Sequence, residues 1–137
     1  MFVWSVRVYY EDTDSGGVVY YANYLKFMER ARTEWLRARG VEQDALLGER
    51  GLIFAVRSLS MDYHRPARFN DLLAIQSRVV EIGGASLLFE QTIQRDPSAE
   101  MLCSARVRVA CIDAKTFRAR RIPRPLVGEI GGIVGDP

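Results

Sequence analysis

Hydrophobic and polar residues alternate at the start of the chain. The first set of alternate positions is large and apolar, and the second set is mostly polar: Phe2, Trp4, Val6, Val8 and Tyr10 against Ser5, Arg7, Tyr9 and Glu11. A period of two predicts a β-strand with one buried face. The stretch EDTDSGG, which is acidic and contains two glycines, ends this strand.

The next segment, YYANYLKFMERARTEWLRARG, has the period of a helix. Its apolar residues recur every three or four positions, which predicts an amphipathic helix over residues 21–39. Gly40 follows as the expected C-terminal stop. This is the only long helical pattern in the sequence, and a shorter helix is expected over residues 41–50.

The remaining chain predicts strands. A Gly83-Gly84 pair between two of the apolar runs indicates a hairpin. The expected strands cover residues 51–64, 71–83, 85–96, 101–113 and 117–123. One long helix against an antiparallel sheet of about five strands is an α+β fold. Apolar residues on both faces, such as Leu87, Leu88 and Phe89 in succession, predict that a second subunit covers the outer face.

Composition fits one soluble domain. Of the 137 residues, 48% are hydrophobic and 26% charged, and the net charge is +2. This balance does not favour nucleic acid or a membrane surface as a partner. No segment is apolar enough for a transmembrane helix, and the N-terminus lacks a signal-peptide pattern, so we expect a cytoplasmic protein. We expect a single domain over residues 1–126 and a loosely ordered tail over residues 127–137.

The sequence does not match the motifs of several common metal- and phosphate-binding sites. The spacing D-x-D-x-x-G from Asp12 resembles a calcium loop, but Asn23 occupies the twelfth position, where a bidentate glutamate is required. No Gly-Lys-Ser/Thr of a phosphate-binding loop follows the glycines. Cys103, Cys111 and His64 are too few for a zinc site, and the cysteines are expected in the core. We therefore expect no metal and no cofactor.

The acidic stretch has two interpretations. Asp12, Thr13, Asp14 and Ser15 are typical turn and capping residues. Alternatively, the flexible Gly-Gly-Val-Val stretch lets the chain fold back, so that the Asp14 carboxylate faces free N–H groups at the helix start. Such N–H groups polarise a carbonyl, and a carboxylate attacks that carbonyl or activates water. This pairing is suited to acyl chemistry.

The run RVYYEDTDSGGVVYYANYLKFMERARTEWL resembles the signature of the 4-hydroxybenzoyl-CoA thioesterase-type hotdog-fold family. Within the family it is most similar to the acyl-CoA thioesterases associated with the bacterial Tol-Pal envelope system. The resemblance includes RPARFNDLL and extends to about residue 126. It implies a helix wrapped by an antiparallel sheet, association into dimers or tetramers, and active sites at subunit interfaces. We expect a homotetramer that acts on acyl-CoA.

The resemblance also implies roles for particular residues. Asp14 matches the catalytic carboxylate, and Tyr21 matches the helix-start residue whose backbone N–H contacts the thioester carbonyl. Gly17 matches a glycine that admits the thioester. The Tol-Pal-associated branch commonly has histidine at the position of Tyr21, so the role of that side chain and the acyl preference stay open.

Further candidates surround these residues. Asn23 and Tyr24 line the acyl pocket or, alternatively, cap and pack the helix. Arg118 and Arg120 are candidates for the coenzyme A phosphates, or else they protect an edge strand. His64 is expected at a surface, and Glu11 and Asp12 are expected to be solvated or structural.

The expected function is hydrolysis of an acyl-CoA thioester to a carboxylic acid and free coenzyme A. Two alternatives remain: a hotdog-fold hydratase or dehydratase acting on an acyl thioester, and a non-catalytic, envelope-associated protein that binds acyl-CoA.

Overall fold

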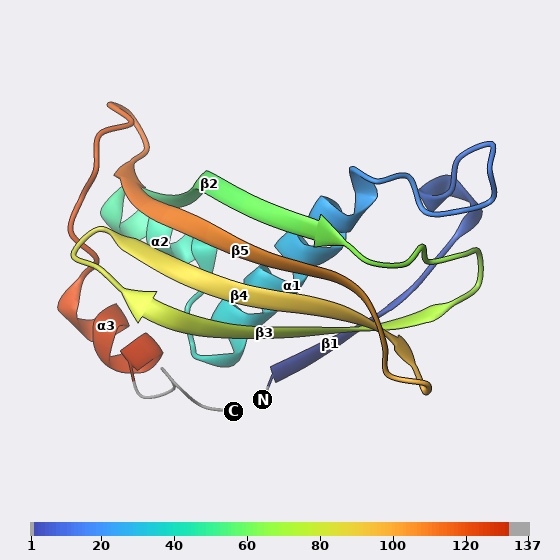
Figure 1. Cartoon of the computed structure of the whole chain (residues 1–137). Coiled ribbons are helices and arrows are strands. Elements are labelled where there is room, and N and C mark those ends of the chain that lie inside the picture. The colour runs from blue at the N-terminus through green and yellow to red at the C-terminus, as the bar shows by residue number, and fades with distance from the viewer. Residues whose placement is uncertain (1, 132–137) are drawn as a thin grey trace.

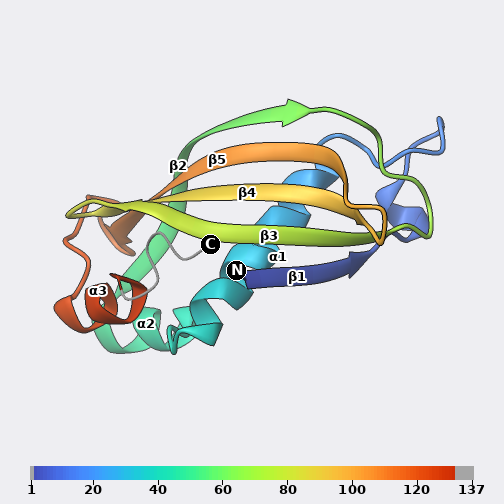
Figure 2. The same ribbon diagram turned by 60° about the horizontal axis from the view of Figure 1, so that its bottom comes forward.

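A five-stranded antiparallel sheet curls around one long helix in the computed structural model, which describes residues 2–131 (Figure 1). The helix is α1 (Asn23–Ala38). The strand order is β1-β3-β4-β5-β2, with bounds β1 Phe2–Arg7, β2 Leu52–Tyr63, β3 Leu72–Ile82, β4 Ser86–Asp96 and β5 Glu100–Asp113. Figure 2 shows α1 lying within the curve of the sheet. The predicted α+β hotdog fold is confirmed.

Helix α1 buries most of the face that its sequence period predicts, although Leu25 of that period is 37% exposed. The buried side chains are Tyr24, Phe27, Met28, Ala31, Trp35 and Leu36. The helix begins later than expected, at Asn23, because Tyr20 is held in a turn: its N–H donates to the Asp12 carbonyl and its own carbonyl accepts from the Asn23 N–H. Beyond α1, Gly40 has φ +81°, a left-handed conformation that favours glycine. Helix α2 (Gln43–Arg50) follows.

The β3–β4 hairpin forms as predicted and supplies much of the core. The Gly83 N–H donates to the Ser86 carbonyl at 2.7 Å and closes the turn. Phe89 of β4 is buried and meets the Trp35 ring of α1 edge-on, with ring centroids 5.2 Å apart. Apolar contacts of this kind fix the sheet against the helix.

One inward-facing residue of β4 is polar. Gln91 is fully buried, and its Nε2 donates to the Met28 carbonyl at 3.0 Å and to Ser77 Oγ at 2.9 Å. Its Oε1 accepts from Arg32 Nη1 at 2.9 Å. All of its hydrogen-bonding atoms are therefore engaged, and the amide joins the middle of α1 to the sheet.

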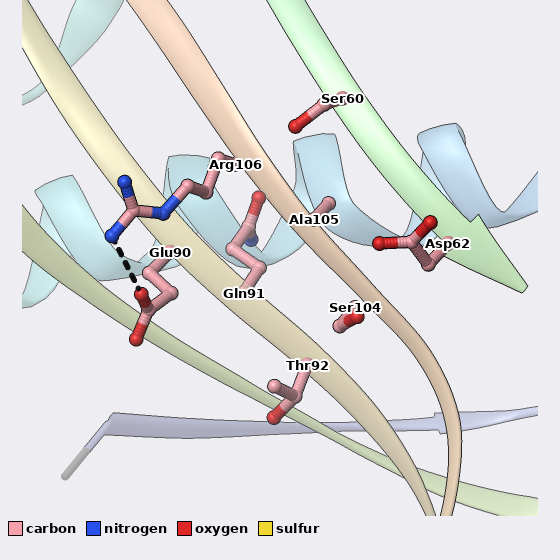
Figure 3. A pocket seen from close by; sticks show the side chains of 8 residues that line it. All are labelled: Ser60, Asp62, Glu90, Gln91, Thr92, Ser104, Ala105 and Arg106. Atoms are coloured by element: carbon pink, nitrogen blue, oxygen red, sulfur yellow. Dashed lines mark hydrogen bonds and ion pairs between the residues drawn. The ribbon is translucent and has the colours of Figure 1, made fainter. Parts of the chain in front are cut away.

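The middle of the outer face of the sheet is polar. Glu90 accepts from Arg78 Nη2 at 2.6 Å and from Arg106 Nη2 at 3.3 Å, and the hydrogen bond from Arg78 is the main cause that lowers the Glu90 pKa. A shallow hollow of about 280 Å³ lies beside this row (Figure 3). The polar side chains that line it on this face are Ser60, Asp62, Glu90, Thr92, Ser104 and Arg106.

The outer face is apolar elsewhere, at a hollow lined by Ala55, Ala110 and Ile112 among others, but Leu88 does not contribute to it. Leu88 does face outward, but its cross-strand partners are Glu81 and Arg108. The alternation of β4 leaves Leu87 and Phe89 on the inner face, where both are buried. Three successive apolar residues therefore do not make an apolar outer surface.

The C-terminal region differs from the expectation. Residues 117–123 make an isolated bridge, Ile112 with Ala119, instead of a strand. Helix α3 (Arg124–Gly131) follows and buries Ile130, so the part of the expected loose tail within 127–131 is helical. Residues 132–137 of that tail lie outside the described residues.

Both cysteines of the chain lie in the core. Cys103 and Cys111 are buried free thiols, as expected of core cysteines, and burial raises the pKa of Cys103 to about 12. Within residues 2–131, no helix is both long and apolar enough to cross a membrane.

Candidate active site

The acidic stretch folds into a small hairpin that projects from one end of the sheet (Figure 1). Thr13 pairs with Val19, and the Asp14 N–H donates to the Val18 carbonyl at 2.9 Å. The Gly17 N–H donates to the Asp14 carbonyl at 3.0 Å, and Gly17 has φ +78°. A turn followed by a left-handed residue is a common hairpin solution, and it requires glycine at this position.

Asp14 is exposed on this hairpin. Its Oδ1 accepts from the Gly16 N–H at 2.8 Å, which is the side-chain turn that aspartate often forms. No other hydrogen bond to the Asp14 carboxylate occurs among residues 2–131. The turn interpretation therefore accounts for one carboxylate oxygen, and the second oxygen is left open for chemistry.

Asp12 joins the base of the hairpin to α1. Its Oδ1 accepts from Asn23 Nδ2 at 2.7 Å, and its Oδ2 accepts from the Tyr9 N–H at 2.8 Å. Its carbonyl also accepts from the Tyr20 N–H at 2.9 Å. Asn23 was expected to line the acyl pocket or to cap the helix, and Asp12 was expected to be solvated or structural. Their side chains in fact bind each other, and no periodicity in the sequence signals that pairing.

Tyr21 lies in the turn that leads into α1, two positions before its first residue Asn23, and not within the helix as expected. Within the described chain, its backbone N–H donates to no acceptor. Its carbonyl accepts from the Tyr63 hydroxyl at 3.1 Å. The Tyr21 N–H is thus held in place and available to a ligand.

The charge of Asp14 reaches this turn. The pKa of Tyr20 is raised, first by a hydrogen bond with the Tyr21 side chain and to a smaller extent by the negative charge of Asp14.

The remaining residues that were predicted to bind substrate lie in two separate parts of the structure. Tyr24 is buried, and its hydroxyl accepts from the Ala67 N–H at 3.0 Å, so it supports the backbone. The segment that follows β5 and contains Arg118 and Arg120 lies at the end of the molecule opposite the hairpin (Figure 1). Arg120 pairs with Asp113 at 2.8 Å. A single protomer does not bring these arginines to Asp14.

A groove between α1 and β2 was not foreseen. It has a volume of about 480 Å³. Leu25 of the first turn of α1 and Val56 and Leu59 of β2 supply its apolar lining, and the charged side chains of α1 that also line it are Lys26, Glu29, Arg30 and Arg32. Strand β2 is an edge strand, so the groove is open along its free edge. Only the curvature of the sheet around α1 creates this space.

The site does not suggest a metal centre. In the part of the chain that the structure describes, no group of three or more His, Cys, Asp or Glu side chains is arranged to hold a metal ion. His64 is exposed, and its Nε2 lies 3.0 Å from Ser104 Oγ on the polar side of the sheet.

Comparison with known proteins agrees with this fold and motif. The Thioesterase superfamily pattern matches residues 16–102. The acyl-CoA thioester hydrolase YbgC of Escherichia coli O6:H1 is 46% identical over 129 residues, covering 94% of this chain and 95% of that protein. The acyl-CoA thioesterase YbgC of Haemophilus influenzae is 48% identical over 123 residues, with coverage of 90% and 89%.

A solved structure is similar throughout its length. The probable thioesterase from Bartonella henselae superposes with a TM-score of 0.82 at 38% identity, covering 89% of this chain and 98% of that chain. Sequence motif, fold and relatives agree over most of the protein. The chain therefore belongs to the thioesterase superfamily.

Proposed function

We propose that this protein hydrolyses acyl-CoA thioesters to a carboxylic acid and free coenzyme A. The observation that carries the proposal is the exposed Asp14 carboxylate on a glycine hairpin, next to the turn that presents the unbonded Tyr21 N–H. Membership of the thioesterase superfamily supports it, as do relatives of nearly equal length that are named acyl-CoA thioester hydrolases.

In this mechanism the Tyr21 N–H donates a hydrogen bond to the thioester carbonyl and stabilises the oxyanion that develops there. Asp14 either attacks the carbonyl carbon or takes a proton from the attacking water. If Asp14 attacks, its oxygen bonds to the carbonyl carbon, the C–S bond breaks, and water then hydrolyses the acyl–aspartyl anhydride to the carboxylic acid and free Asp14. If water attacks, its oxygen bonds to the carbonyl carbon as Asp14 takes its proton, and the C–S bond breaks. In both cases the thiolate of coenzyme A takes up a proton. Gly17 keeps the hairpin turn compact beside the bound thioester.

The polarity of the outer sheet face and the position of His64 favour hydrolysis over hydration of a double bond. His64 is the only histidine, and it pairs with Ser104, whose side chain lines the polar outer hollow. The apolar groove lies on the other face of the sheet, against α1. A histidine acid or base is therefore not provided beside the groove by the same protomer.

The enzyme is proposed to act as a homo-oligomer. Strand β2 is a sheet edge of 12 residues, and Val56, Leu59 and Tyr63 are exposed along it. A long edge with exposed apolar side chains is a template for pairing with another strand. A second copy paired there closes the groove. Arg118 is then a candidate for the coenzyme A phosphates only if another protomer supplies it.

Leu59→Asp tests this interface. We expect it to raise the dimer dissociation constant at least about tenfold, because burying an unpaired carboxylate costs at least about 2 kcal/mol. Analytical ultracentrifugation over a concentration series measures the change. Leu47→Asp on α2 is the matched control, since Leu47 is 46% exposed and Leu59 is 44% exposed. If both variants had the same dimer dissociation constant as wild type, β2 would be ruled out as the interface.

The activity itself is tested with a panel of short aliphatic, aromatic and long-chain acyl-CoA thioesters. We expect free thiol, followed with a thiol reagent, to appear faster than in the enzyme-free reaction for at least one of them. An enoyl-CoA is assayed beside the panel, and loss of its absorbance without thiol release indicates a hydratase. Binding of acyl-CoA with no turnover indicates a non-catalytic protein, and either result would overturn the proposal.

A further inference from the structure

We propose that Asp12 is a positioning residue, which holds the hairpin that bears Asp14 in register with the turn that bears Tyr21. This inference rests on the proposed function and deepens it. Asp12 touches neither the thioester nor the attacking water. It acts through the backbone that carries the two groups that do.

The contacts of Asp12 connect three segments. Its Oδ2 accepts from the Tyr9 N–H, at the end of the chain that leaves β1. Its Oδ1 accepts from Asn23 Nδ2 in the first turn of α1, at 2.7 Å. Its carbonyl accepts from the Tyr20 N–H, the residue directly before Tyr21. One residue thus ties β1, α1 and the Tyr20-Tyr21 turn together.

The hairpin needs this support because little else joins its first strand to α1. The second strand is attached elsewhere: the Val19 N–H donates to the Ala67 carbonyl, and Val18 bridges to Arg68. The tip contains Gly16 and Gly17, is exposed, and has no packed side chain to hold it. The Asp12–Asn23 bond is the side-chain link between the first strand of the hairpin and the helix start.

The start of α1 also depends on this bond. The residue that precedes the helix is Ala22, which makes no side-chain capping bond. Asn23 donates its amide to Asp12, and its N–H donates to the Tyr20 carbonyl. The carboxylate also places a negative charge near the positive end of the helix dipole. Asp12 therefore sets the orientation of the turn that presents the Tyr21 N–H.

Small displacements matter for such a site. Attack on a carbonyl requires the reacting atoms in a narrow range of distance and angle, and a shift of about 1 Å costs up to about 10²-fold in rate. Loss of the Asp12–Asn23 bond lets the hairpin and the helix start move relative to each other. We expect this to lower kcat more than it changes KM.

The test uses Asp12→Asn, Asn23→Asp and the double variant, in the full-length protein. In Asp12→Asn an NH₂ group replaces one of the two acceptor oxygens, so it faces one of the two donors, the Tyr9 N–H or Asn23 Nδ2. In Asn23→Asp two carboxylates face each other. In the double variant the amide at position 12 donates to the carboxylate at position 23, and its oxygen still accepts from the Tyr9 N–H. Each variant is measured for kcat and KM with an acyl-CoA that wild type hydrolyses, and for thermal unfolding.

We expect each single substitution to lower kcat by roughly 10-fold to 100-fold, and the double variant to recover to within about threefold of wild type. Glu11→Gln is the control, since Glu11 is the exposed acidic neighbour of Asp12. Its kcat is expected to equal that of wild type. Recovery in the double variant shows that the bond matters and not the charge at position 12.

Three outcomes would overturn the inference. Single variants as active as wild type would show that the bond has no role in catalysis. A double variant that stays slow while it unfolds at the wild-type temperature would show that the Asp12 carboxylate acts directly. A fall in unfolding temperature that accounts for the whole loss of activity, with kcat per folded molecule unchanged, would leave only a structural role. Absence of thiol release by wild type itself would instead refute the proposed function.

Discussion

Asp14→Asn is expected to lower the rate of thiol release from acyl-CoA by about 10²-fold to 10⁴-fold, the range typical of a lost general base. The substitution keeps the size of the side chain. The amide oxygen still accepts from the Gly16 N–H, so the hairpin turn is preserved. The amide neither attacks a carbonyl nor accepts a proton from water, and only the chemical step is affected.

The comparison is made under saturating substrate, with the release of thiol followed over time. Ser15→Ala, on the same exposed hairpin, is the control for general disturbance of the loop, and its rate should stay close to that of wild type. Hydrolysis by Asp14→Asn at the wild-type rate would show that another group performs the chemistry. Substrate binding by Asp14→Asn without turnover separates loss of chemistry from loss of the site.

Gln91→Leu is expected to lower the free energy of unfolding by about 3 kcal/mol, because each buried polar group that loses its partner costs about 1–3 kcal/mol. The leucine has a similar volume, so no cavity forms. Ser77 Oγ and Arg32 Nη1 lose their partner on the inner face of the sheet. Burial already lowers the pKa of Arg32, so its guanidinium is partly removed from water before the substitution.

Urea unfolding at one fixed protein concentration measures this change, because association shifts apparent stability. Thr92→Val on the outer face of the same strand is the matched control, and we expect a change of no more than about 1 kcal/mol. Adding Arg32→Leu to Gln91→Leu should restore part of the loss, since both partners of the bond are then apolar. If Gln91→Leu alone unfolded at the same urea concentration as wild type, the buried amide would not be needed for stability.

Some elements were predictable because their signals are local. The period of two in the first segment, the helical period after residue 21 and the Gly83-Gly84 turn each depend on residues close together in sequence. The structure has a strand, a helix and a hairpin at these places. The start of α1 was misplaced because the bond between the Tyr20 N–H and the Asp12 carbonyl involves residues outside the helical pattern.

The elements near the C-terminus were less predictable. Residues 117–123 alternate like a strand, but they form only the isolated bridge of Ala119 to Ile112 and scattered backbone hydrogen bonds to the end of β5 and to Gly84, not a continuous ladder. The glycine-rich residues from 127 onward were expected to be loosely ordered, whereas the burial of Ile130 against the protein stabilises α3 as far as Gly131. In both cases tertiary contacts outweigh local propensity.

The sequence by itself determined the class of fold, the family and the acidic hairpin with Asp14 and Gly17, because periodicity and motif spacing are properties of the chain. Only the tertiary structure decided which side chains meet. It paired Asp12 with Asn23, left the Tyr21 N–H without an acceptor in the described chain, opened the groove beside β2 and placed the segment after β5, with Arg118 and Arg120, far from the hairpin. Contacts between residues far apart in sequence depend on how the sheet curves around α1, and no local pattern encodes that curvature.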